Sequence, residues 1–179
     1  MNLSITGKLG SGKSTICKEL EAEGYEIITA GSIFREIATE RGISVVELNE
    51  QAKTDSSLDT LIDTRTTELS EQKDKCIFDC RLGWFFAPKT IKIFVDVDIN
   101  VAARRVMNDT RRTAESYATL DDAVIGIMKR QEMERDRFLA LYKADIYDMS
   151  NYDLVINSTD TDAKALATLI LNAIDQFKA

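Results

Sequence analysis

A glycine-rich segment at residues 7–15 constrains this chain more than any other feature of its sequence. It reads GKLGSGKST and fits the phosphate-binding P-loop pattern G-x-x-x-x-G-K-[ST]. Its glycines let the backbone fold closely around a polyphosphate with the N–H groups turned inward, where Cβ atoms would obstruct the fold. The helix expected after the loop presents its positive N-terminal end to the same anion. The segment therefore predicts a polyphosphate site.

The residues on either side of the P-loop agree with the motif. Residues 2–6 alternate apolar and polar side chains, which predicts a short strand, and residues 13–23 carry apolar side chains at helical spacing before Gly24. Lys13 is expected to reach the β- and γ-phosphates, and the Ser14 hydroxyl to ligate Mg²⁺. The other loop positions expected to surround the phosphates are Gly7, Lys8, Leu9, Gly10, Ser11, Gly12 and Thr15.

Composition excludes several classes of function. A length of 179 residues suits one domain, 1–179, with a full core. The net charge of −7 argues against a nucleic-acid partner. No apolar run is long enough to span a membrane, the P-loop begins too early for a signal peptide, and the cysteine count of 3 is odd, so we expect a cytoplasmic protein. The absence of histidine excludes Ser-His-Asp and Cys-His chemistry within the chain.

Strand and helix patterns alternate along the chain. Further strands are expected at 25–29, 75–79, 90–95 and 152–157, and further helices at 30–41, 120–142 and 163–177. This alternation predicts an α/β fold with a parallel sheet of about five strands and helices on both faces, with ligands beyond the carboxyl ends of the strands.

Two insertions interrupt this alternation. Residues 44–72 are polar and predict two or three helices, the first opened by a capping box from Ser44 to Glu47. Residues 100–149 predict a charged hairpin that carries Arg104, Arg105, Arg111 and Arg112. Within residues 129–137 only Met133 is apolar, which indicates a helix that bridges, covers or stands off the core.

Charged side chains gather at the expected carboxyl ends of the strands. Asp79 ends an apolar strand, where P-loop enzymes place the acid that holds Mg²⁺, although aspartate is also common in turns. Arg81 follows two residues later and suits bidentate recognition of a phosphate. Arg35 lies one helical turn into the helix after the second strand, near Arg41.

Arg130, Glu134 and Arg137 share one helix face because their spacing is i, i+4, i+7. Such a row is either a solvated set of ion pairs or a source of cations for the crevice. Phosphoryl transfer requires several cations to neutralise the charge of the transferring group. An acidic chain that concentrates arginine at expected crevice positions favours the second interpretation.

Taken together, these residues resemble the nucleoside monophosphate kinases, most closely the small archaeal-type cytidylate kinases. The resemblance covers nearly the whole chain and rests on residues 7–15, 30–35, 40–42, Asp59, Asp63, 81–84, Arg130, Glu134, Arg137, Tyr142, Asp145 and 152–157. It implies a P-loop kinase fold with a helical monophosphate-binding cap at about 44–72 and a closing lid at about 100–149. ATP would lie in the P-loop, with a nucleoside monophosphate under residues 31–72.

The resemblance also implies roles for individual residues. Lys13, Arg81, Arg130 and Arg137 would act on the transferring phosphoryl group, while Ser14 and Asp79 would hold Mg²⁺. The acceptor would be bound by Gly31, Arg35, Arg41, Asp59, Asp63 and Arg81. Four positions depart from the residues usual in the family: Cys80 in place of glycine, Gln131 and Phe138 in place of glutamate and tyrosine, and Asp109 near an expected arginine.

The implied activity is ATP-dependent transfer to CMP or dCMP by a monomer or dimer. Another small-molecule P-loop kinase, acting on dephospho-CoA, a sugar or another nucleotide, is an alternative, as is a nucleotide-binding relative without turnover. A GTPase switch is not indicated, because no Asn-Lys-x-Asp sequence is present.

Overall fold

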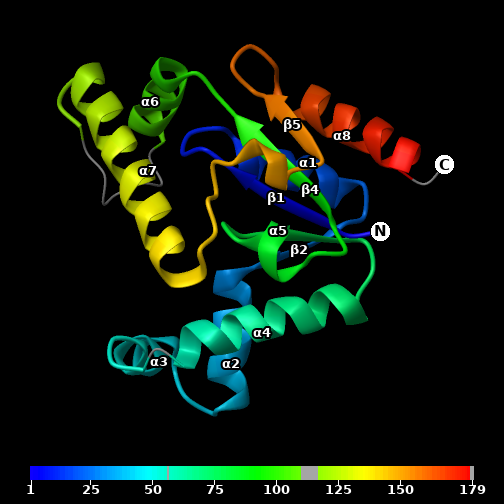
Figure 1. The fold of residues 1–179 in the computed structure, drawn as a ribbon, viewed down its shortest axis with the longest axis vertical. Helices are drawn as coiled ribbons and strands as arrows, with labels where there is room; N and C mark the ends of the chain where they lie inside the picture. The colour runs from blue at the N-terminus through cyan, green and yellow to red at the C-terminus, as the bar shows by residue number, and fades with distance from the viewer. Residues whose placement is uncertain (56, 110–116, 178–179) are drawn as a thin grey trace.

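The strand that leads into the P-loop lies at the centre of the sheet. The computed structural model describes residues 1–55, 57–109 and 117–177. In these residues five parallel strands are ordered β2-β3-β1-β4-β5 (Figure 1). The strands are β1 (Leu3–Gly7), β2 (Glu26–Thr29), β3 (Cys76–Asp79), β4 (Ile91–Asp96) and β5 (Leu154–Asn157). This confirms the predicted parallel sheet, with each strand within two residues of its expected bounds.

The burial of β1 agrees with its central place in the sheet. All five of its residues are buried, as expected for a parallel strand covered on both faces. It pairs with β4 from Leu3 opposite Ile91 to Gly7 opposite Val95, and with β3 on its other side. The P-loop therefore leaves the sheet between the carboxyl ends of β3 and β4, where parallel α/β sheets place their ligands.

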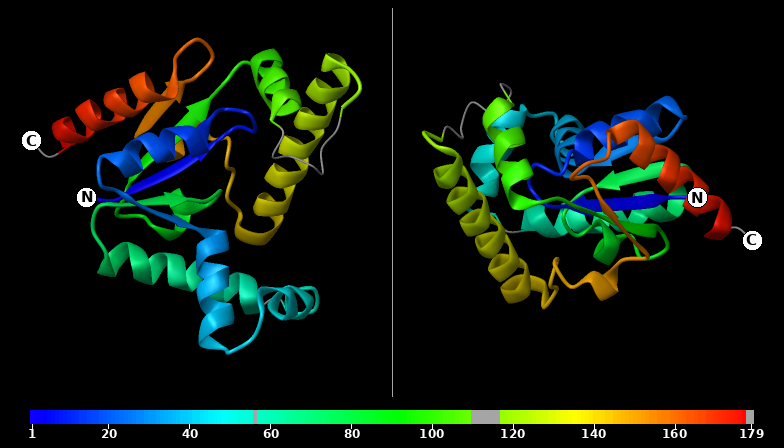
Figure 2. Two further views of the ribbon diagram at one scale, coloured as in Figure 1. Left: turned by 180° about the vertical axis from the view of Figure 1, so that it is seen from behind. Right: turned by 90° about the horizontal axis from the view of Figure 1, so that it is seen from above.

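Helices cover both faces of the sheet. Helices α1 (Lys13–Ala22) and α8 (Ala163–Phe177) pack together on one face, over Leu3, Ile5 and Ile93 (Figure 2). The opposite face presents Ile28, Phe78 and Phe94. It is covered by α2 (Ala30–Glu40), α4 (Ser57–Gln72), the short α5 (Gly83–Phe86) and the chain that returns from α7 (Leu120–Tyr142) through the 3₁₀ turn η1 (Met149–Asn151).

The polar insertion after α2 forms two helices, α3 (Val45–Ala52) and α4. The predicted capping box is present: Glu47 N donates to Ser44 Oγ at 3.1 Å, and Ser44 N donates to Glu47 Oε2 at 2.8 Å. Leu48 and Leu58 are buried against Ile33 and Ile37 of α2, so these helices share a core beside the sheet.

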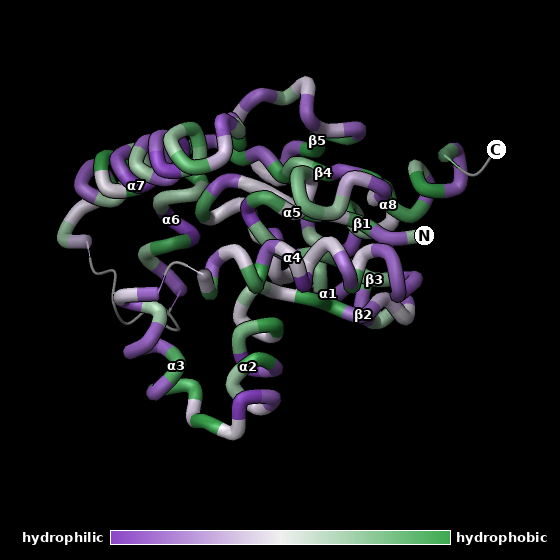
Figure 3. The backbone as a smooth tube through the Cα atoms, turned by 60° about the horizontal axis from the view of Figure 1, so that its bottom comes forward, coloured by the Kyte–Doolittle hydropathy of each residue, from purple (hydrophilic) through white to green (hydrophobic). Residues whose placement is uncertain are grey.

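The charged hairpin consists of α6 (Ile99–Asn108) and α7 (Leu120–Tyr142), and α7 has the bounds predicted from the sequence. Ala123 and Ile127 are buried against α6, whereas Met128 and Met133 are exposed. Hydrophilic and hydrophobic residues are mixed along α7 (Figure 3), and within residues 129–137 only Met133 is apolar. Arg111 and Arg112 lie outside the described residues. None of the described helices is both long and apolar enough to cross a membrane.

Candidate active site

The P-loop has the backbone conformation that its glycines allow. Gly10 and Gly12 have φ values of 78° and 75°, in the left-handed region that other residues rarely adopt. A Cβ atom on Gly10 would lie 2.7 Å from the carbonyl oxygen of Ala102, so α6 packs directly on the loop backbone. Gly12 is the N-cap of α1, and the positive end of that helix faces the loop.

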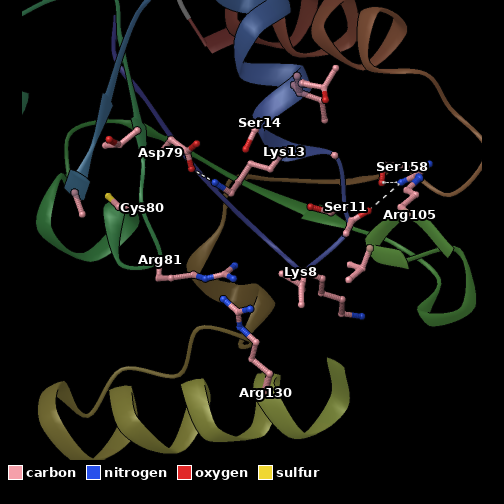
Figure 4. Close-up of a pocket in the computed structure, with 18 of the residues that line it drawn as sticks. Lys8, Ser11, Lys13, Ser14, Asp79, Cys80, Arg81, Arg105, Arg130 and Ser158 are labelled. Atoms are coloured by element: carbon pink, nitrogen blue, oxygen red, sulfur yellow. Dashed lines mark hydrogen bonds and ion pairs between the residues drawn. The ribbon is translucent and has the colours of Figure 1, made fainter. Parts of the chain in front are cut away.

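Lys13 and Asp79 form an ion pair at the centre of this site (Figure 4). Their side chains are only 18% and 13% exposed. Burial lowers the pKa of Lys13 to about 8, and the neighbouring Arg81 guanidinium acts in the same direction. The Asp79 carboxylate in contact with the amine favours its charged form. The pair keeps the Lys13 ammonium group at the N-terminus of α1, where a bound phosphate would replace the Asp79 carboxylate as its partner.

A cavity of about 1140 Å³ opens beside this pair. The predicted site residues that line it are Lys8, Leu9, Gly10, Ser11, Gly12, Lys13, Ser14, Thr15, Gly31, Asp59, Asp63, Asp79, Arg81, Arg130 and Arg137. Three others do not line it. Gly7 lies at the end of β1, and Arg41 is exposed at the end of α2. Arg35 is also exposed, and its guanidinium lies beside Gly31, with Nη1 3.5 Å from where a Cβ atom on that glycine would be.

Arg81 is held from several sides. Its Nη1 donates to Gly7 O, and its Nε lies 3.2 Å from Glu134 Oε2. Arg130 Nε lies 3.7 Å from the other oxygen of Glu134, so one carboxylate from α7 stands beside two guanidinium groups. Figure 4 shows Arg81 and Arg130 pointing toward each other. The arrangement resembles a phosphate site because two cations converge on one anionic group.

Helices α4 and α7 meet across the far part of the cavity. Tyr142 donates its hydroxyl proton to Asp63 Oδ2 at 2.8 Å. Arg137 lies 3.7 Å from Asp59, and both side chains are exposed. Arg137 therefore lies at the mouth of the cavity, whereas Arg130 faces its interior beside Arg81.

Several residues of the site were not assigned roles from the sequence. Arg105 donates to Ser158 O at 2.7 Å and to Gly10 O at 3.4 Å, which joins α6 to the loop after β5. The same part of the cavity is lined by Val101, Arg104, Thr161 and Asp162. The rule that ligands lie beyond strand ends, applied to β5, was the signal that could have indicated this loop. Thr6 was also missed: its hydroxyl donates to the carbonyl oxygens of Cys80 and Arg81 at 3.1 and 3.3 Å.

Ser14 and Asp79, beside the P-loop lysine, are suited to an Mg²⁺ ion whose other ligands are substrate phosphates and water. Ser14 and Asp79 both line the cavity beside Lys13. The described residues contain no group of three or more His, Cys, Asp or Glu side chains suited to a metal. Mg²⁺ is typically bound through one or two carboxylates together with phosphates and water, so one carboxylate and one hydroxyl are a suitable donor set.

Comparison with known proteins agrees with this arrangement. The model of the cytidylate kinase-like family matches residues 2–160. The chain belongs to the cytidylate kinase-like family. A cytidylate kinase of Methanocella arvoryzae is 34% identical over 99% of both chains, and one of Sulfolobus acidocaldarius is 33% identical over 98% of this chain and 95% of its own.

Solved structures share the fold of this cytidylate kinase-like protein. An uncharacterized protein from Eubacterium ventriosum matches with a TM-score of 0.73 at 17% identity, covering 98% of both chains. Shikimate kinase from Acinetobacter baumannii, solved with shikimate, matches with a TM-score of 0.60 at 18% identity, covering 99% of this chain and 94% of that one. At these identities the likeness concerns the fold, which is that of the P-loop kinases.

Asp109 and two further departures from the family pattern, Cys80 and Phe138, line the cavity of this cytidylate kinase-like protein. Burial raises the pKa of the Cys80 thiol to about 12, so this side chain is neutral beside Arg81. A Cβ atom on Gly83 would lie 3.1 Å from Cys80 Sγ, so the thiol packs against the start of α5. Phe138 lines the cavity with a ring 6.4 Å from that of Tyr142, and it presents no hydroxyl. Both changes leave the P-loop itself unaltered.

Proposed function

We propose that this chain transfers the γ-phosphoryl group of ATP to a nucleoside monophosphate, with CMP or dCMP as the acceptor. The observation that carries the proposal is one continuous cavity lined both by the P-loop with Lys13 and by two convergent arginines, Arg81 and Arg130. Membership of the cytidylate kinase-like family supports the choice of acceptor. Phosphoryl transfer between two nucleotides requires two anion sites within reach of each other.

The chain's own residues supply position and charge. The P-loop amides and Lys13 hold the donor phosphates at the N-terminus of α1. Arg81 and Arg130 exchange the Glu134 carboxylate for the acceptor phosphate, which places the attacking oxygen in line with the γ-phosphorus. No general base is required, because the acceptor phosphate is already an anion. Helix α7 shields the crevice, and this matters because water would otherwise compete as acceptor.

Ser14 and Asp79 would hold Mg²⁺ in this proposal. When bound, the ion neutralises charge on the β- and γ-phosphates. Asp79 is freed for this role when phosphate oxygens replace it as the partner of Lys13. Ser14 stands at the start of α1, on the same side of the cavity.

The proposal is tested by measuring phosphate transfer from ATP to a panel of acceptors. The panel contains CMP, dCMP, UMP, AMP, GMP, dephospho-CoA and shikimate, and products are separated by ion-exchange chromatography. CDP or dCDP should form with the highest kcat/KM. Transfer to dephospho-CoA or shikimate in preference to any nucleotide would contradict it, and so would tight ATP binding with no transfer to any acceptor.

A further inference from the structure

Tyr147 carries a hydroxyl group that is buried and has no hydrogen-bond partner among the described residues. Its ring packs against Phe94 of β4, with the ring centroids 6.1 Å apart and the planes nearly perpendicular. The neighbouring Tyr152 packs on the same ring, but its hydroxyl donates to Ile146 O at 2.8 Å. Because buried polar groups are paired in the great majority of cases, the orphaned hydroxyl of Tyr147 indicates a partner that reaches it in another state of the protein.

The charged groups around this hydroxyl are those of the acceptor end of the cavity. Burial raises the pKa of Tyr147 to about 12. The Arg81 and Arg130 guanidinium groups oppose this rise, and the Glu134 carboxylate adds to it. Tyr147 therefore stays neutral near pH 7 and has a proton to donate. Guanidinium groups are donors only, so the acceptor that the hydroxyl lacks is a carboxylate.

Asp145 fixes Tyr147 near Glu134 without using the hydroxyl. Its carboxylate accepts the backbone N–H of Tyr147 at 3.0 Å. The same carboxylate accepts Nε and Nη2 of Arg135 from α7, at 3.0 and 2.5 Å. Arg135 directly follows Glu134, so Asp145 ties the turn that carries Tyr147 to the helical segment that carries Glu134. Of the two carboxylates that act on the hydroxyl, Asp145 is thus already occupied, and Glu134 is the available acceptor.

We propose that Tyr147 is a positioning residue, whose hydroxyl receives the Glu134 carboxylate when an acceptor phosphate displaces that carboxylate from its two arginine partners. The inference rests on the proposed function and adds to it the place to which the displaced charge moves. In the free protein the Glu134 oxygens lie 3.2 and 3.7 Å from Nε of Arg81 and Arg130, and the side chain is 23% exposed. A partly buried carboxylate that loses both partners is poorly solvated unless another donor takes their place. A hydrogen bond from Tyr147 offsets this cost and leaves the arginines to the phosphate.

The test compares the effect of Tyr147→Phe in the wild-type chain and in Glu134→Gln. In the wild-type chain the substitution should raise the Kd for CMP by roughly tenfold, the low end of what a hydrogen bond to a charged group contributes. The Kd for ATP and kcat at saturating CMP should change little. In Glu134→Gln no charge is displaced, so adding Tyr147→Phe should change the Kd for CMP by less than about twofold. Calorimetry with each ligand measures both constants.

The melting temperature of the free protein separates this role from a purely structural one. Tyr147→Phe removes a hydroxyl that has no partner among the described residues, so it should leave the melting temperature unchanged or raise it. Tyr152→Phe is the matched control, because it removes a paired hydroxyl from the same aromatic cluster, and it should lower the melting temperature. Any effect of Tyr152→Phe on the Kd for CMP should be the same with and without Glu134→Gln.

Any of four results would overturn the inference. An unchanged Kd for CMP in Tyr147→Phe would mean that the displaced carboxylate does not need the hydroxyl. The same rise with and without Glu134→Gln would mean that Tyr147 acts through packing or on Arg81 itself, and equal losses of CMP and ATP affinity would mean a general disturbance. A lower melting temperature, or failure of Tyr147→Phe to fold, would mean that the hydroxyl already has a partner in the free protein. Failure of the proposed function is distinct, because the wild-type chain would then show no transfer to CMP.

Discussion

The two ends of the cavity position their charges in different ways. At the donor end, the P-loop backbone and the first residue of α1 fix the site, and Lys13 is 18% exposed. At the acceptor end, long side chains come from separate elements, and exposure rises from 26% for Arg81 to 42% for Arg130 and 63% for Arg137. Both ends must exchange an internal ion pair for substrate, but the backbone of the donor end is already in place, whereas the arginines of the acceptor end come from separate elements. Changes at the two ends should therefore affect different steps.

The largest effect is expected at the donor end. Lys13→Ala should lower kcat by about a hundredfold or more with every acceptor, because one preorganised charge beside the transferring group is lost. The melting temperature should change little, since Lys13 faces the cavity. Lys18→Ala, an exposed lysine on the same helix, serves as the control. Near-full activity of Lys13→Ala in a steady-state assay would contradict the assignment of the P-loop.

A smaller and more selective effect is expected at Arg81. Arg81→Ala removes charge-assisted hydrogen bonds worth about 1.5–3 kcal/mol each, so CMP should bind roughly 10–100-fold more weakly while ATP affinity stays close to normal. Calorimetry with each ligand separately measures this difference. Arg35→Ala should weaken CMP binding less, because Arg35 is exposed and does not line the cavity. Equal losses of ATP and CMP would remove the distinction between the two ends.

The same contrast explains what the sequence could predict. The donor end follows from a local motif, since the backbone of residues 7–15 builds it and the spacing is visible in the sequence. The sheet and α7 were predictable because apolar side chains recur at the periods of strands and helices. The capping box at Ser44 and Glu47 was predictable for the same local reason.

The acceptor end was less predictable because its contacts join distant elements. Sequence spacing placed Glu134 on one face with Arg130 and Arg137, but it could not show that Glu134 also reaches Arg81. Arg35 is expected to bind substrate, and the sequence could not show that its exposed side chain lies beside Gly31 without lining the cavity itself. Both outcomes depend on how each helix is rotated against the elements that it packs on, and local sequence spacing does not determine that rotation.

Glu134 offers a way to sharpen the comparison. In the free protein its carboxylate partly neutralises Arg81 and Arg130, so an acceptor phosphate must displace it. Glu134→Gln should lower the KM for CMP by about threefold, within the range of one partly exposed ion pair, with little change in the KM for ATP. Glu132→Gln, exposed on the same helix, is the control. A raised KM for CMP would instead show that Glu134 holds the arginines in their productive positions.

The smallest effect on turnover is expected at the mouth of the cavity. Arg137 and Asp59 are 3.7 Å apart and mostly exposed, and such pairs contribute about 0–1 kcal/mol, so separating α7 from α4 there costs little. Phosphates bound in the crevice attract Arg137 only when α7 is close, and this difference shifts the population toward the closed state. A bisubstrate analogue should therefore slow hydrogen exchange across residues 120–142 more than ATP alone does. Arg137→Ala should lower kcat about threefold, whereas Lys129→Ala, exposed on the same helix, should not. Identical exchange with and without the analogue would mean that Arg137 belongs to a solvated row of ion pairs, and the acceptor end would then be as rigid as the donor end.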